Sequence, residues 1–421
     1  MSSLNDDLQQ LEQIEDEEWE RQRRIKRKQR IEEMKRRKAK AQMIHRCVMA
    51  AAVVVLLIAG LGIGSVIRSA AVRGKEPAEN DGQNTGVNMA DGSTGDTEDI
   101  GDTGDAGDMR VLSPHALVDS YGQTGVPQND LHATPESPAS VFTATTTEHT
   151  ANFSDTIVSE YGILVDVEAG TILAGKDAMT RMNPASMTKI LTVLTAAEAL
   201  GVEDDTSEIL DDTITFTLDI TDYCFVNDCS VVGYELGETA TVRDLFYGTI
   251  LPSGAETALG LAIYVAGSHE AFVEMMNQKL EKMGLSETTH FTNCVGIYDE
   301  QHYSTAYDIA VILEEASKNE FCRQVLSAHT YNTTYTEEHP EGMMISNLFL
   351  RRIEDRDTHG EVICGKTGYV SRAGHCAASL ATDVNGREYL CVTAGSSSVW
   401  QCIRDQVELY QSYLTGLAED V

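Results

Sequence analysis

Residues 164–189, LVDVEAGTILAGKDAMTRMNPASMTK, contain two predicted strands followed by the start of a predicted helix. The apolar runs 161–167 and 171–174 flank a Glu-Ala-Gly turn, which is typical of a strand pair. From Ser186 onward the apolar residues recur with helical spacing, and Pro184 suits a helix N-terminus. The shared apolar face of this helix consists of Ile190, Leu191, Leu194, Ala197 and Leu200.

The rest of the C-terminal part alternates between helical and strand-like patterns. Helical spacing predicts further helices at 241–250, 255–266, 268–283, 305–317 and roughly 400–415. Three alternating runs predict consecutive antiparallel strands at 361–367, 375–382 and 388–395. Strands at both ends with helices between them predict an α+β domain over 152–421, with an antiparallel sheet flanked by helices.

Ser186-Met187-Thr188-Lys189 places a serine and a lysine one helical turn apart, on the same face. A serine hydroxyl needs a neighbouring base to become a good nucleophile, and a buried lysine can stay neutral and act as that base. A helix start also favours a developing oxyanion. A serine three residues before a lysine is common by chance, so this pattern alone is a weak signal.

Lys366-Thr367-Gly368 stands at the end of the first C-terminal strand. A strand edge can bind an extended peptide as one more strand. The lysine supplies a cation for a terminal carboxylate, the threonine supplies a hydroxyl, and the glycine permits close approach to the backbone. The alternative is an ordinary turn at the end of a strand.

With Ser253-Gly254-Ala255 between them, these two motifs resemble the three motifs of the penicillin-binding protein and serine β-lactamase superfamily. The stretches 164–189, 291–310 and 365–376 resemble more specifically the serine D-Ala-D-Ala carboxypeptidase family. The resemblance covers 155–415 and implies a β-lactamase/transpeptidase-like fold. It also implies a peptidoglycan stem pentapeptide as substrate, β-lactams as inhibitors that acylate the serine, and no cofactor.

The resemblance further implies a role for each motif residue. Ser186 would attack the penultimate D-Ala carbonyl and form an acyl-enzyme, with Lys189 as general base. Ser253 would relay a proton to the leaving D-Ala. The implied substrate-binding residues are Lys366, Thr367, Gly368, Tyr369 and Arg404. Tyr369 would contribute its backbone N–H to the oxyanion hole, together with the backbone N–H of Ser186. Arg404 matches a family arginine that recognises the carboxylate.

The second motif departs from the family pattern, because Ala255 stands where the family has an asparagine. Losing that polar contact motivates a second hypothesis, a catalytically weak penicillin-binding scaffold that recruits a division or sporulation partner. A β-lactamase is disfavoured, since the Glu-x-x-Leu-Asn element that would position a deacylating water is absent.

The N-terminal part predicts a membrane anchor. Residues 47–67 are 21 residues without a charge, enough to span a bilayer as a helix. The charged segment 1–46, predicted helical, carries 13 Lys and Arg between Arg21 and Arg46, which predicts a cytoplasmic N-terminus and an extracellular C-terminal part. A cleaved signal peptide would need an unusually long n-region. The segment 68–151 is rich in Gly, Asp, Thr and Ser and predicts a flexible acidic linker.

Charge disfavours nucleic acid as a partner, since the chain has a net charge of −34, carried by the part after residue 75. The charged N-terminal helix could bind a protein partner or simply be solvated. Cys224 and Cys229 could close a small disulfide loop, or the cysteines could be buried as thiols. No metal site is predicted, and structural roles are expected for His269, His302 and His375.

Overall fold

The computed structural model describes residues 141–414. The predictions for 1–46, 47–67 and 68–140 therefore lie outside the described residues. Among the described residues, no helix combines the length and apolar content needed to cross a membrane.

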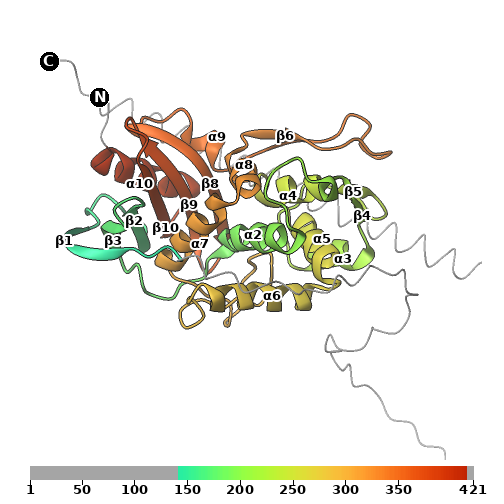
Figure 1. Cartoon of the computed structure of the whole chain (residues 1–421), viewed down its shortest axis with the longest axis horizontal. Coiled ribbons are helices and arrows are strands. Elements are labelled where there is room, and N and C mark those ends of the chain that lie inside the picture. Colours follow the sequence, from blue (N-terminus) through green and yellow to red (C-terminus); the bar gives the residue numbers. More distant parts are fainter. Residues whose placement is uncertain (1–140, 415–421) are drawn as a thin grey trace, which may run out of the picture. The chain divides into compact units, whose positions relative to one another are not determined.

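A six-stranded sheet forms one side of the described domain, with strand order β1-β3-β2-β10-β9-β8 (Figure 1). Its strands are β1 (Thr145–Asn152), β2 (Tyr161–Asp166), β3 (Thr171–Lys176), β8 (Gly360–Val370), β9 (Gly374–Asp383) and β10 (Glu388–Ser396). The three C-terminal strands and the β2–β3 pair are antiparallel, as predicted. Strands from the two ends of the domain meet where β2 pairs with β10.

Two predictions about this sheet are wrong. The sheet is mixed rather than antiparallel, because β1 pairs with β3 in the parallel sense. The predicted linker 68–151 also extends too far, since residues 145–151 belong to β1. Most β1 side chains are exposed, so the strand lacks the alternation of buried and exposed residues by which a strand is recognised in a sequence.

Alternation along the central strands gives the sheet two apolar faces. Leu380 and Val392 point into the main core beneath the helical region, whereas Ala381 and Cys391 pack against Leu409 and Tyr410 of the last helix. Helix α10 (Val399–Tyr413) thus covers the sheet face opposite α7 (Ala306–Lys318), as Figure 1 shows.

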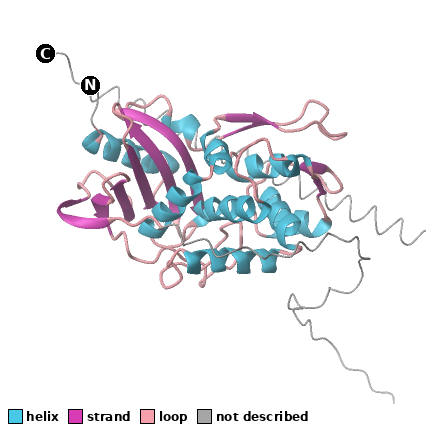
Figure 2. Cartoon of the chain, viewed as in Figure 1, coloured by secondary structure: helices cyan, strands magenta, loops and turns pink. Residues whose placement is uncertain are grey.

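The helical region lies beside the sheet (Figure 2). Its central helix, α2 (Thr188–Leu200), is buried continuously from Thr188 to Ala197. A helix with apolar residues on all sides belongs in a core, and α2 contacts neighbours on several sides. The remaining helices are α3 (Leu218–Val226), α4 (Val242–Ile250), α5 (Ala255–Ala266), α6 (His269–Lys282), α8 (Glu320–Ser327) and α9 (Leu350–Ile353), with 3₁₀ turns η1 (Ala185–Met187) and η2 (Glu208–Asp211).

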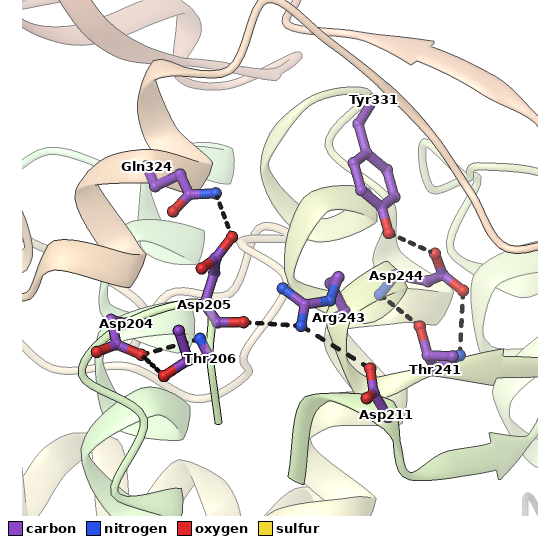
Figure 3. A network of polar contacts seen from close by, with 9 residues as sticks. All are labelled: Asp204, Asp205, Thr206, Asp211, Thr241, Arg243, Asp244, Gln324 and Tyr331. Carbon is purple, nitrogen blue, oxygen red and sulfur yellow. Dashed lines mark hydrogen bonds and ion pairs between the residues drawn. The ribbon is translucent and has the colours of Figure 1, made fainter. Parts of the chain in front are cut away.

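Polar contacts fix α4 at the centre of a network that reaches the long hairpin of β6 (Thr330–Asn332) and β7 (Met344–Ser346) (Figure 3). Thr241 and Asp244 form a capping box at the start of α4. Asp244 also accepts a hydrogen bond of 2.9 Å from the Tyr331 hydroxyl. Asp244 therefore binds the hairpin as well as capping α4. The short β4–β5 pair (Thr213–Thr215 and Thr239–Thr241) ends at Thr241, the other residue of the capping box.

Cys224 and Cys229 are free thiols in the structure, as are the other six cysteines of the described residues. Cys364, Cys376 and Cys391 are buried in the strands. This agrees with the alternative that the cysteines are buried as thiols and act as small apolar side chains.

Candidate active site

Ser186 lies in the 3₁₀ turn η1, immediately before α2, rather than within the helix as predicted. The backbone of the preceding Ala185 has a φ of 48°, which is uncommon for a residue with a side chain. Its N–H donates to Oδ1 of Asn183 at 3.0 Å, and its carbonyl accepts from the Thr188 hydroxyl at 2.8 Å. These bonds hold the strained turn and so fix the position of the Ser186 hydroxyl.

Lys189 meets Ser186 as the spacing predicts. Its Nζ donates to the Ser186 Oγ at 3.1 Å and to the Val295 carbonyl at 2.6 Å. The side chain is 1% exposed. Burial lowers the pKa of Lys189 from its ordinary value, because desolvation disfavours the ammonium form, and the nearby Cys229 and Cys294 oppose this shift.

Ser253 and Lys366 form a second hydroxyl–amine pair. Lys366 Nζ donates to the Ser253 Oγ at 2.9 Å and to the Thr367 carbonyl at 2.8 Å. Ser253 lies between α4 and α5 with a φ of 65°, the second strained non-glycine position at this site. Burial, together with the charge of Lys189, lowers the pKa of Lys366 well below its ordinary value. The two pairs are therefore close enough to interact.

The edge strand β8 runs beside the serine. A Cβ added to Gly368 would lie 3.0 Å from the Ser186 backbone nitrogen, so only a glycine allows this approach without displacement. Thr367 precedes it, and Tyr369 follows with 48% of its surface exposed and its ring stacked on His375 at 4.4 Å. Since β8 is the last strand of the sheet order, its outer edge can accept another strand.

The structure places Arg404 on the last helix of the domain. It belongs to α10, on the sheet face opposite α2, and it donates to Oε1 of Gln401 on the same helix at 3.0 Å. Its matching to a carboxylate-binding arginine remains a prediction.

Sequence reasoning missed the loop that supports the serine–lysine pair. Asn293 accepts hydrogen bonds from the backbone N–H groups of Val295, Gly296 and Ile297, which shapes the turn. That turn directs the Val295 carbonyl at Lys189. Gly296 has a φ of 78° and packs on the Ala185 backbone. The glycine was the only local signal of this contact, because a backbone carbonyl leaves no trace in a sequence.

The three histidines make structural contacts, as expected. His302 is buried, its Nδ1 accepts from the Thr292 N–H at 3.1 Å, and its Nε2 lies 2.8 Å from the Thr188 hydroxyl. Burial lowers the pKa of His302 to about 3, so the ring is neutral at pH 7. His269 accepts from the Cys294 N–H at 3.2 Å, and His375 stacks on Tyr369.

Ala255, at the altered third position of the second motif, begins α5. Its N–H donates to the Ser230 carbonyl at 2.8 Å, and its methyl group is buried. A methyl group cannot hydrogen-bond to Lys189 or to a substrate amide, so any such contact has to come from other groups.

Fold and cluster together define a class: an α+β protein whose serine, at the start of a buried helix, faces a lysine and the edge strand of a sheet. Among solved structures, the crystal structure of the Streptomyces K15 DD-transpeptidase matches with a TM-score of 0.53 and 28% identity, covering 62% of this chain and 100% of that one. A D-alanyl-D-alanine carboxypeptidase structure from Mycobacterium tuberculosis matches with a TM-score of 0.51 and 25% identity, covering 61% of this chain and 91% of that one.

The sequence profile of the D-alanyl-D-alanine carboxypeptidase family matches residues 144–397, and the chain belongs to this family. The curated D-alanyl-D-alanine carboxypeptidase of Streptomyces sp. K15 is 30% identical over 259 residues, which are 60% of this chain and 86% of that protein. The carboxypeptidase DacF of Bacillus subtilis is 29% identical over 236 residues, covering 56% of this chain and 57% of its own length. The chain thus spans little more than half of this second relative.

Proposed function

We propose that this protein is a serine D-Ala-D-Ala carboxypeptidase that removes the terminal D-Ala from peptidoglycan stem pentapeptides. The observation that carries the proposal is the pairing of two hydroxyls with two buried amines beside an edge strand. Lys189 lies 3.1 Å from the Ser186 hydroxyl, and Lys366 lies 2.9 Å from the Ser253 hydroxyl. Membership of the carboxypeptidase family supports the same activity.

In the proposed acylation step, Ser186 Oγ bonds to the carbonyl carbon of the penultimate D-Ala. Neutral Lys189 takes the hydroxyl proton, and Ser253 relays a proton to the leaving amine as the C–N bond breaks. Backbone N–H groups of Ser186 and Tyr369 stabilise the oxyanion. Water then cleaves the ester of the acyl-enzyme and frees the serine. These steps need only groups of the chain and a water molecule, so the proposed mechanism requires no cofactor.

The proposed binding mode pairs the C-terminal carboxylate with Lys366 and Thr367. The peptide extends along β8, and Gly368 allows its backbone to approach Ser186. Penicillin presents a strained amide and a carboxylate in a similar arrangement, so it is expected to acylate the same serine.

The test is D-Ala release by the full-length chain from a peptide ending in D-Ala-D-Ala. Ser186→Ala should lower release by at least about a thousandfold, since the nucleophile is lost. Ser286→Ala removes an exposed hydroxyl outside the cluster and should release D-Ala at the parent rate. Mass spectrometry should find penicillin on Ser186 in the parent and the control. D-Ala release that persists in Ser186→Ala would refute the mechanism.

The buried methyl of Ala255 favours one alternative, a penicillin-binding scaffold with weak turnover that recruits a division or sporulation partner through its N-terminal segment. The scaffold would be acylated stoichiometrically by penicillin yet release little or no D-Ala from the peptide. The same two measurements therefore separate the hypotheses.

We also propose that residues 47–67 anchor the protein in the bacterial cell membrane as a single pass, with a cytoplasmic N-terminus and an extracellular catalytic domain. The uncharged run and the preceding Lys and Arg residues support this placement. Protease added to intact cells lacking an outer barrier should cut between 68 and 140 and release the domain. A domain that is protected in intact cells and cut only after lysis would contradict the proposal.

A further inference from the structure

The direction in which a substrate would run along β8 follows from the residues that would hold its two ends. Lys366, for the terminal carboxylate, comes two residues before Gly368, which adjoins the Ser186 nitrogen. A peptide whose last carboxylate is at Lys366 and whose scissile carbonyl is at Ser186 therefore runs antiparallel to β8. The residues before the D-Ala pair then lie beside Val370 and the turn that follows it.

A cavity of about 270 Å³ lies at this end of the strand. Its position is fixed by Asn183, three residues before the nucleophile, and by Arg372 in the turn between β8 and β9. The lining residues are Glu160, Tyr161, Arg181, Met182, Asn183, Tyr298, Arg372 and Ala373. The cavity thus adjoins the site on the side where the acyl-donor part of a peptide would lie.

Arg372 is held in a defined position although it is exposed. Its Nη1 donates to the Tyr298 hydroxyl at 3.1 Å, and its guanidinium carbon lies 4.9 Å from the centre of the Tyr298 ring. A guanidinium has several N–H donors, so this one bond leaves others for a ligand. A planar, oriented guanidinium of this kind suits the bidentate binding of a carboxylate.

Glu160 contributes a charge of the opposite sign to the same cavity. It precedes β2, and its side chain lies against Gly395 at the end of β10. The second guanidinium, Arg181, is directed elsewhere, since it lies 4.1 Å above the Tyr303 ring and donates to the Glu287 carbonyl. The cavity therefore offers a cation at Arg372 and an anion at Glu160.

We propose that this cavity binds the side chain of the substrate residue that directly precedes the D-Ala pair. The ligand is the end of that side chain, when it carries both an amino group and a carboxylate. Arg372 takes the carboxylate and Glu160 takes the ammonium group. The preferred substrate is therefore a stem peptide with a diamino dicarboxylic acid at this position, over one with lysine. This inference rests on the proposed function and names its substrate class.

Three matched peptides test it, each ending in D-Ala-D-Ala and differing only at the end of the preceding side chain. The first carries the amine and the carboxylate, the second has the carboxylate amidated, and the third has the amine acetylated. With the full-length parent chain, kcat/KM for the first peptide should exceed each of the others about three- to tenfold, mainly through KM, as expected for one partly exposed ion pair.

The variants should separate the two contacts. Arg372→Ala should abolish the preference for the first peptide over the amidated one and keep its preference over the acetylated one. Glu160→Gln should abolish the preference over the acetylated peptide and keep the preference over the amidated one. Arg372→Lys should restore part of the preference over the amidated peptide, because lysine keeps the positive charge but cannot bind a carboxylate through two parallel N–H groups. Arg351→Ala removes an exposed arginine of α9, outside the cavity, and should keep both preferences.

Equal effects of Arg372→Ala on all three peptides, or no preference in the parent, would overturn the inference. The proposed function fails separately, if the parent releases D-Ala from none of the peptides. In that event the preference is still measurable as protection of Ser186 from fluorescent penicillin by each peptide. Equal protection by all three would again overturn the assignment of the cavity.

Discussion

At the scale of residues, the site contains two buried lysine amines, one hydrogen-bonded to Ser186 and the other to Ser253. Burial lowers the pKa of both, and the charge of Lys189 further lowers the pKa of Lys366. Interacting groups of this kind release their protons as a pair. A substrate carboxylate at Lys366 would favour its ammonium form, and Lys189 would then be the amine that stays neutral and accepts the serine proton.

This arrangement predicts the pH dependence of Ser186 acylation. A lysine loses its proton as pH rises, so the neutral base form of Lys189 accumulates with increasing pH. Loss of the Lys366 proton then weakens carboxylate binding at higher pH. We expect kcat for a D-Ala-D-Ala peptide, which reports the substrate-bound enzyme, to rise with pH with a midpoint below 10.5, the ordinary lysine value. A rising limb centred at 10.5 would show that Lys189 is not perturbed.

The same scale shows what the sequence could and could not reveal about the site. Ser186 and Lys189 are one turn apart, so local geometry alone predicts their contact. Ser253 and Lys366 are far apart in sequence, and only the family resemblance joined them. The Val295 carbonyl was not predictable, because a backbone acceptor can belong to any residue and its position depends on how the loop folds.

At the scale of elements, the loop containing Gly296 and the turn η1 support each other. A Cβ on Gly296 would lie 2.0 Å from the Ala185 carbonyl oxygen and 2.9 Å from the Ser186 nitrogen. Both neighbours are backbone atoms, which cannot move aside as a flexible side chain can. The position of the nucleophile therefore depends on the absence of one methyl group in a loop distant in sequence.

Gly296→Ala should therefore slow the acylation of Ser186 by penicillin at least about a hundredfold, because displacing the serine by an ångström is enough for such a loss. Gly267→Ala is the matched control, since Gly267 has a similar φ of 77° and nothing lies within 4 Å of its added Cβ. The control should lose about 1 kcal/mol of stability and acylate at the parent rate. Equal acylation rates for the two variants would contradict the proposed support.

Elements with strong periodicity were predictable and short or exposed ones were not. The helices α2, α4, α5, α6 and α7 and the strands β8, β9 and β10 follow apolar patterns that the sequence displays. The short helices α3 and α8 were missed, and so were the pairs β4–β5 and β6–β7, whose strands have three residues each. Such strands are stabilised by long-range contacts, such as that of Tyr331 with Asp244, and not by their own pattern.

At the scale of the whole described domain, the two edge strands of the sheet have different roles. The edge strand β8 borders the candidate active site, whereas the opposite edge is closed by β1. Just before β1, Ala144 is buried in the main core, with Val141 and Phe142 packed against it. The N-terminal strand therefore belongs to the folded domain and protects the edge of β3, although its polar side chains suggest a linker.

A fragment of residues 153–421 should accordingly be less stable than a fragment of 141–421, by about 2–4 kcal/mol, for the lost apolar burial and the lost strand hydrogen bonds. Denaturant unfolding of the two fragments measures this difference. The uncovered edge of β3 should also make the shorter fragment aggregate more readily. Because β8 is at the other edge, the folded fraction of both fragments should be acylated by penicillin at the same rate. Equal free energies of unfolding for the two fragments would mean that β1 does not stabilise the sheet. The folded domain would then begin at residue 152, as the sequence predicted.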